Sequence, residues 1–184
     1  MGKPMVAVLA AGLGTRFGGD KLEAMCAGKP LGRWVIEAVE AAGLGPGTIV
    51  TGPEWVTFAG GWTRAVNTEP EAGLGSSLAL AARLAGGKPS LLILLADMAL
   101  VTPAYLRELA ARTAPAATRY PDGYAGVPAL LDRKLIDKAA RLTGDRGAGP
   151  LLRHARLLDP PPEMLRDVDT SEDLAAVETQ LSAR

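Results

Sequence analysis

The sequence of 184 residues has one cysteine, Cys26, and one histidine, His154, so it can form neither an intramolecular disulfide nor a cysteine-based zinc site. It also lacks an excess of charge, because 20 lysines and arginines balance 20 aspartates and glutamates. Domains that bind DNA or RNA usually carry a basic excess, so no nucleic-acid partner is expected. No apolar run reaches the ~18 residues of a membrane span, and the N-terminus does not resemble a secretion signal. These absences predict a cytoplasmic protein without a membrane partner.

Length and composition predict one folded domain over residues 1–184, because hydrophobic residues make up 48% of the chain. Short apolar runs, typical of strands buried on both faces, lie at residues 5–10, 48–51 and 91–96, with weaker candidates at 63–67, 126–131 and 164–169. Helical patterns alternate with them at residues 31–42, 76–85, 103–112, 133–142, 147–155 and 171–181. This alternation predicts an α/β fold, a three-layer α-β-α Rossmann-like arrangement around a mostly parallel sheet. Ligands of such folds bind where the strands end.

The loop after the first apolar run has the residue types that bind a triphosphate. Four glycines occur within residues 12–19, and Arg16 and Lys21 add two positive charges. Glycines let backbone N–H groups converge on an anion. Two better-known phosphate loops do not fit: the third glycine of a Rossmann fingerprint is replaced by Phe17, and the Lys-Ser/Thr pair of a P-loop is replaced by Asp20 and Lys21.

Residues 9–21, with the pattern L-A-A-G-x-G-x-R-x-G-x-x-K, resemble the signature loop of nucleotidyltransferases that join a nucleoside triphosphate to a phosphorylated acceptor. The resemblance implies a nucleotidyltransferase fold and catalytic roles for Arg16 and Lys21. It also implies nucleotide contacts from Leu9, Ala10, Ala11, Gly12, Gly14, Thr15, Arg16 and Lys21.

Asp97 directly follows the apolar run at residues 91–96, which places it at the same edge as the glycine-rich loop. Carboxylates beside phosphate oxygens are a usual environment of Mg²⁺, so we expect Asp97 to be catalytic and to bind this ion. Residues 167–174 resemble a D-I-D-T-P-E-D-L segment of one nucleotidyltransferase branch, which implies Asp169 as the second ligand. Asp167 is an alternative, because residues two apart on a strand face the same way. The competing interpretation of these aspartates is that they form turns and helix caps.

Two further segments resemble the molybdenum cofactor nucleotidylyltransferases, especially the cytidylyl branch. Residues 73–78 are similar to a G-x-S-S-S-L segment, and residues 144–148 to a G-D-R-G-A segment. Asp145 and Arg146 could orient the acceptor or could pair with each other in a turn. The first segment implies nucleotide contacts from Gly75, Ser76 and Ser77 at a helix N-terminus, where a well-capped helix is the alternative. The chain departs from the family pattern at Ala99 and Val127, where proline and histidine are common.

The resemblance implies transfer of a nucleotide from an NTP, with CTP as the implied donor, to the phosphate of molybdopterin or the molybdenum cofactor, with release of pyrophosphate. Mg²⁺ is the implied cofactor, and transient contact with molybdoenzymes or their chaperones is implied. Two alternatives stay open at this point. One is a sugar- or alditol-phosphate nucleotidyltransferase, and the other is a non-catalytic nucleotide-binding accessory protein.

Overall fold

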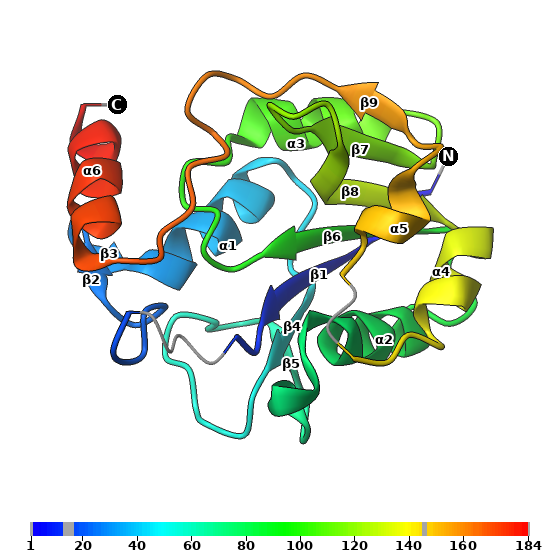
Figure 1. Ribbon diagram of the computed structural model, residues 1–184, viewed down its shortest axis with the longest axis horizontal. Helices are drawn as coiled ribbons and strands as arrows, with labels where there is room; N and C mark the ends of the chain where they lie inside the picture. The colour runs from blue at the N-terminus through cyan, green and yellow to red at the C-terminus, as the bar shows by residue number, and fades with distance from the viewer. Residues whose placement is uncertain (1, 13–16, 145–146, 184) are drawn as a thin grey trace.

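The computed structural model describes residues 2–12, 17–144 and 147–183, and its centre is a seven-stranded sheet in the order β5-β4-β1-β6-β8-β7-β9 (Figure 1). Six strands run in one direction and β8 runs against them. The strands are β1 (Met5–Ala10), β4 (Thr48–Thr51), β5 (Thr63–Val66), β6 (Ser90–Leu95), β7 (Ala116–Arg119), β8 (Ala125–Asp132) and β9 (Arg156–Leu158). The mostly parallel sheet predicted from the sequence is therefore confirmed.

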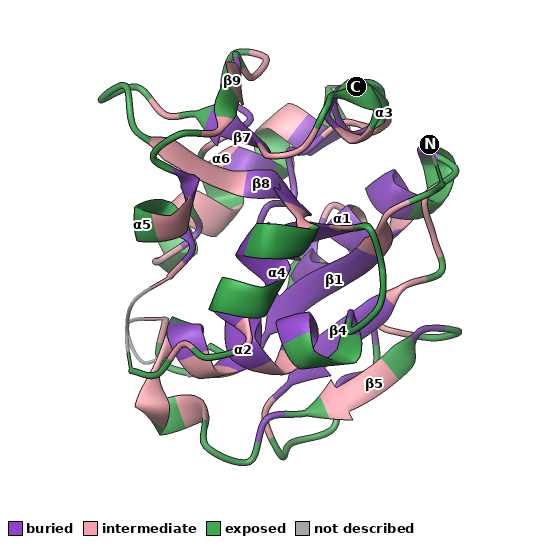
Figure 2. Ribbon diagram, turned by 90° about the vertical axis from the view of Figure 1, so that its right-hand side faces the viewer, coloured by how far each residue is buried: buried purple, intermediate pink, exposed green. Residues whose placement is uncertain are grey.

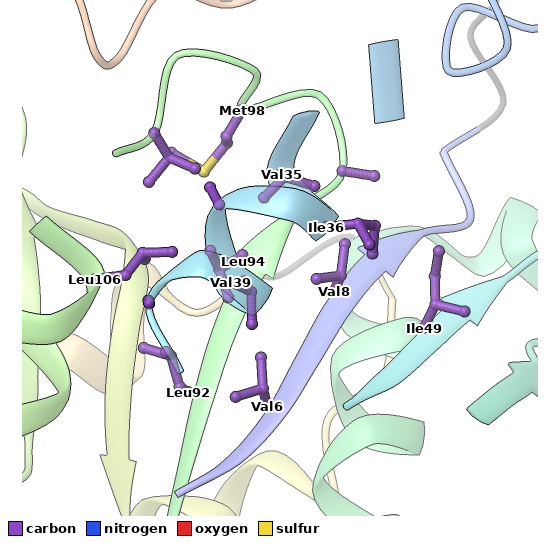
Figure 3. Close-up of a cluster of buried hydrophobic side chains, with 14 of the residues drawn as sticks. Val6, Val8, Val35, Ile36, Val39, Ile49, Leu92, Leu94, Met98 and Leu106 are labelled. Carbon is purple, nitrogen blue, oxygen red and sulfur yellow. The ribbon is translucent and has the colours of Figure 1, made fainter. Parts of the chain in front are cut away.

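Helices cover both faces of the sheet. They are α1 (Leu31–Ala41), α2 (Leu74–Leu84), α3 (Pro103–Ala111), α4 (Arg133–Ala139) and α5 (Gly149–Leu152). The chain also forms a short 3₁₀ helix, η1 (Pro70–Ala72), and a last helix, α6 (Ser171–Ser182). On one face, alternate residues of β1 such as Val6 and Val8 pack with Val35 and Val39 of α1 and with Leu106 of α3 (Figure 3).

Ala7 and Leu9 of β1 face the opposite side of the sheet and pack with α2, α4 and α5. Because successive side chains of a strand point to opposite faces, a central strand with a core on each side has to be apolar throughout. Figure 2 shows this contrast: β1 and β4 are buried, whereas the edge strand β5 is partly exposed. The three-layer α-β-α fold expected from the alternation is confirmed.

The last helix lies apart from the sheet, beside the antiparallel pair β2 (Met25–Cys26) and β3 (Lys29–Pro30) (Figure 1). Val177 and Leu181 of α6 share a small apolar cluster with Cys26 and Val168, and the Ala27 N–H donates to Glu178 Oε1 at 2.8 Å. Thr170 and Asp173 form a reciprocal capping box that starts α6. The segment that leads into α6 lies beside Lys21, whose ammonium nitrogen contacts the Val168 carbonyl oxygen.

Some sequence predictions need correction. The strand expected at residues 164–169 is a turn followed by extended chain without sheet pairing, so the argument that placed Asp167 and Asp169 on one strand face is wrong. The helix expected at residues 147–155 is only the four residues of α5. The short strands β7 and β9 were not predicted, because three or four residues carry little periodic signal. No helix in the described ranges is long and apolar enough to cross a membrane.

Candidate active site

A cleft of about 570 Å³ lies across the ends of β4, β1 and β6, a volume that suits a small-molecule ligand. Parallel strands that lie side by side end at the same edge, so the loops that follow them meet there. The segments that line the cleft are residues 9–12, 19–22, 52–54 and 95–97, with Val56, Pro70, Glu71, Gly73, Leu74 and Ser77. The glycine-rich loop and the acid after β6 therefore share one cleft, as the sequence predicted.

Lys21 joins the loop to two of the predicted acids. Its ammonium nitrogen donates to Asp97 Oδ2 at 2.8 Å and to the Val168 carbonyl oxygen at 2.7 Å. Asp169 Oδ1 lies 3.6 Å from the same nitrogen. The Lys21 side chain is 15% exposed, so the contacts form in a largely desolvated position where charge interactions are stronger than in water. Three chain segments that are far apart in sequence thus meet at one nitrogen atom.

Local structure fixes each of these groups. Lys21 lies in a turn that is tied to the start of α1, because Gly32 donates its N–H to Leu22 O at 2.9 Å. At the other side, the Ala96 N–H donates to Leu9 O at 2.9 Å, which holds the residue before Asp97 against the end of β1. Val168 is fully buried beneath α6. The site is therefore braced by the core and by the C-terminal helix.

Negative charge accumulates around this point. Burial raises the pKa of Asp167, and the nearby charges of Asp97 and Asp169 raise it further, while Lys21 partly offsets them. Burial, followed by the charges of Asp167 and Asp97, raises the pKa of Tyr120 to about 12. A nearby cation favours ionised carboxylates, so a divalent ion bound here would relieve their mutual repulsion.

The donor set suits a Mg²⁺ ion that arrives with a phosphorylated substrate. Within the described ranges, no three His, Cys, Asp or Glu side chains converge on a ready-made metal cage. Asp97 and Asp169 nevertheless approach the same ammonium group, so both carboxylates face one small volume. Mg²⁺ in phosphate chemistry is commonly bound by one or two carboxylates together with substrate phosphates and water. These residues fit that arrangement.

The serine-rich segment at the start of α2 contributes differently at each residue. Ser77 lines the cleft, and its hydroxyl accepts from Asn67 Nδ2 at 2.9 Å. Ser76 Oγ accepts from the same amide at 2.8 Å and donates to Gly73 O at 2.7 Å. The Gly75 N–H donates to Gly144 O at 3.1 Å. Sequence reasoning missed buried Asn67, although its place directly after β5 is a signal that could have found it.

The far wall of the cleft was also missed. It consists of Gly52, Pro53 and Glu54 after β4, with Glu71 from η1. In the sequence, Thr51-Gly52-Pro53 lacks the acid that a Rossmann site has after its second strand, and Glu54 is the next residue. The general rule that ligands bind after parallel strands could have included it.

Several predicted residues lie outside the described ranges, namely Gly14, Thr15, Arg16, Asp145 and Arg146. Of the other predicted nucleotide-binding residues, Leu9, Ala10, Ala11, Gly12, Lys21 and Ser77 line the cleft, whereas Gly75 and Ser76 are not among the residues that line it.

An α/β fold with a glycine-rich loop and a carboxylate at the ends of neighbouring strands defines a class of nucleotide-binding proteins. Within that class, the family model of the MobA-like NTP transferase domain matches residues 6–160 of the chain. The chain therefore belongs to the MobA-like nucleotidyltransferase family.

Solved structures share the fold. A nucleotidyl transferase from Methanothermobacter thermautotrophicus has a TM-score of 0.80 at 23% identity, with 100% of both chains covered. Rv0371c from Mycobacterium tuberculosis has a TM-score of 0.78 at 23% identity, covering 96% of this chain and 98% of the other. Molybdopterin-guanine dinucleotide biosynthesis protein A from Archaeoglobus fulgidus has a TM-score of 0.69 at 20% identity, covering 98% and 100%. No curated protein gave a significant match to the chain.

Proposed function

We propose that the chain transfers CMP from CTP to the terminal phosphate of molybdopterin or the molybdenum cofactor and releases pyrophosphate. The observation that carries the proposal is the position of Lys21 between Asp97 and Asp169 in the cleft where β1 and β6 end. Family membership supports the transfer of a nucleotide. The similarity of residues 73–78 and 144–148 to the cytidylyl branch favours CTP as the donor and a pterin phosphate as the acceptor.

In this proposal the triphosphate lies along the loop after β1. Backbone groups of residues 9–12 line the cleft beside Lys21, whose ammonium group neutralises phosphate charge. Gly14, Thr15 and Arg16 belong to the same loop and complete the proposed contacts, and Gly75, Ser76 and Ser77 approach the nucleotide from α2. Preorganised donors of this kind lower the barrier, because they are in place before charge develops.

Asp97 and Asp169 would hold Mg²⁺, with Asp167 as the alternative to Asp169. When bound, the ion would supply positive charge that offsets the negative charge developing on the phosphates during transfer. An oxygen of the acceptor phosphate attacks the α-phosphorus of the NTP, the bond between the α- and β-phosphates breaks, and its electron pair leaves with pyrophosphate. The acceptor phosphate is already ionised, so the step needs no strong base.

We further propose that the chain acts as a single domain over residues 1–184 in the cytoplasm. Its partners would be the NTP and the pterin acceptor, with transient contacts to the molybdoenzymes or chaperones that receive the product. A cleft of about 570 Å³ supports small-molecule partners rather than a nucleic acid.

The test is pyrophosphate release with each of the four NTPs, Mg²⁺, and either molybdopterin or a set of sugar and alditol phosphates. The proposal expects release with CTP and molybdopterin, and mass spectrometry should find the joined product. Release only with a sugar or alditol phosphate would replace the acceptor, and binding of NTP without release under any acceptor would indicate a non-catalytic binding protein. Either result contradicts the proposal.

A further inference from the structure

The cleft has a second end that the transfer chemistry leaves unexplained. In the sheet order β4-β1-β6, β1 separates the segment that follows β4 from Asp97, which follows β6. Glu54 lines the cleft on the β4 side, and Glu71 lines it from η1. The two segments adjoin, because a Cβ atom placed on Gly52 would lie 3.9 Å from Pro70 Cγ. Two acidic residues therefore border one end of the cleft.

Arg64 fixes the segment that carries Glu54. From β5, its Nη2 donates to the carbonyl oxygens of Gly52, Pro53 and Glu54 at 3.1, 2.9 and 2.7 Å. Its Nε donates to Thr51 Oγ1 at 2.9 Å, and the guanidinium carbon lies 5.2 Å from the ring centroid of Trp55. The guanidinium therefore positions the backbone, while the Glu54 carboxylate is left for another partner.

Both carboxylates are free to accept hydrogen bonds. Within the ranges that the structure describes, neither the Glu54 nor the Glu71 side chain has a hydrogen bond or ion pair, and both residues are exposed. A triphosphate would be repelled by them, so a nucleotide whose phosphates lie at Lys21 must place its base or ribose at this end. A carboxylate only accepts hydrogen bonds, so it favours a ligand that presents N–H groups.

We propose that Glu54 and Glu71 select the nucleobase by accepting hydrogen bonds from an exocyclic amino group, which makes the cleft discriminate CTP from UTP. Cytosine carries an amino group at position 4, with one hydrogen for each carboxylate. Uracil carries an oxygen there, and its single ring N–H is flanked by two carbonyl oxygens that repel a carboxylate. The inference rests on the proposed function, because it takes the phosphates to lie at Lys21.

The experiment is calorimetric titration of CTP and UTP, in Mg²⁺, into the wild type and into E54Q, E71Q and the double variant. A glutamine has the same shape as glutamate but can also donate to the uracil oxygen. We expect the wild type to bind CTP about tenfold or more tightly than UTP, since the free energy of one hydrogen bond to a charged group corresponds to an affinity ratio of about that size. The double variant should bring the two affinities within about threefold, partly through tighter UTP binding.

Glu69→Gln is the matched control, because Glu69 is exposed and directly precedes η1 but does not line the cleft. It should keep the wild-type ratio of affinities. Equal binding of CTP and UTP by the wild type would overturn the inference, and so would an equal loss of affinity for both nucleotides in the double variant, because that pattern indicates contact with the ribose. No binding of any NTP would instead overturn the proposed function itself.

Discussion

The two ends of the cleft are built in different ways. At one end, Lys21 contacts Asp97 and Val168, which are 76 and 147 residues away in the sequence. At the other end, Arg64 contacts carbonyl oxygens only 10 to 12 residues away. The first end depends on the packing of the whole fold, including the docking of α6, whereas the second is a local device of β4, β5 and the loop between them.

In the proposed function, the core-held end of the cleft would carry out the transfer, and the locally built end would select the nucleotide. The charged groups that would act on the phosphates are held by the core, so their geometry changes little when a surface loop changes. The wall that would contact the base lies on loop and 3₁₀ segments, which tolerate substitution. We therefore expect changes at the first end to affect turnover and changes at the second end to affect which nucleotide binds.

The largest effect is expected for Asp97→Asn. The substitution removes a negative charge needed for the proposed metal, so pyrophosphate release should fall by about a thousandfold or more. The fold should melt normally, because Asp97 is at the edge of the core and asparagine has the same shape. Asp137→Asn on the exposed face of α4 is the control and should keep full activity. Full activity of Asp97→Asn would refute the metal role.

A smaller loss is expected for Lys21→Ala. Without the ammonium group, the triphosphate loses a charged hydrogen-bond donor, and the dissociation constant of the NTP should rise about 10- to 100-fold. Calorimetry measures this directly, with Lys88→Ala, an exposed lysine after α2, as the control. Unchanged affinity in Lys21→Ala would contradict the assignment of the triphosphate to this end.

The second end is disturbed by Arg64→Ala, which releases the carbonyl oxygens of residues 52–54. We expect the KM for the NTP to rise about 3- to 10-fold with kcat changed less than twofold, because in the proposed arrangement the loop would contact the nucleotide but not the reacting atoms. Arg64→Lys should restore only part of the binding, since one ammonium cannot reproduce the planar fork of donors. Steady-state pyrophosphate release gives both constants, and a fall in kcat at constant KM would place Arg64 in the chemistry instead.

The smallest effect concerns stability without metal. The pKa of Asp167 is raised, so the folded state holds this proton more tightly than the unfolded chain. Asp167 thus supports folding below the ordinary carboxyl pKa and opposes folding once the pH rises through its folded pKa. Asp167→Asn should therefore raise the melting temperature at pH 7 by about 1–3 °C, and the gain should vanish near pH 3.5. The same gain at both pH values would show that charge is not its cause, and Asp20→Asn is the exposed control.

Much of the fold could be predicted from the sequence, because its strongest signals are local. The strands at Met5–Ala10 and Thr48–Thr51 were predicted to the residue, since a strand buried on both faces needs a continuous apolar run. The reversed direction of β8 could not be predicted, because its apolar pattern is the same in either direction. The expected strand at residues 164–169 failed for a related reason: Met164 and Val168 are buried against other elements without joining the sheet.

The site can likewise be divided into parts that the sequence predicts and parts that it does not. The glycine-rich loop and Asp97 could be brought together, because both follow apolar strands and parallel strands end at one edge. The contact between Lys21 and the Val168 carbonyl depends on where α6 docks, and periodicity gives no information about that. Arg64 and Glu54 were missed because each resembles an ordinary polar surface residue until the loop is seen in space.

The most direct test of which end of the cleft binds the phosphates is a crystal structure with CTP and Mn²⁺, in which anomalous scattering locates the ion. We expect the ion between Asp97 and the phosphates, with Lys21 on the triphosphate and the cytosine beside Glu54 and Glu71. Phosphates bound beside Glu54, or an ion far from Asp97, would contradict it.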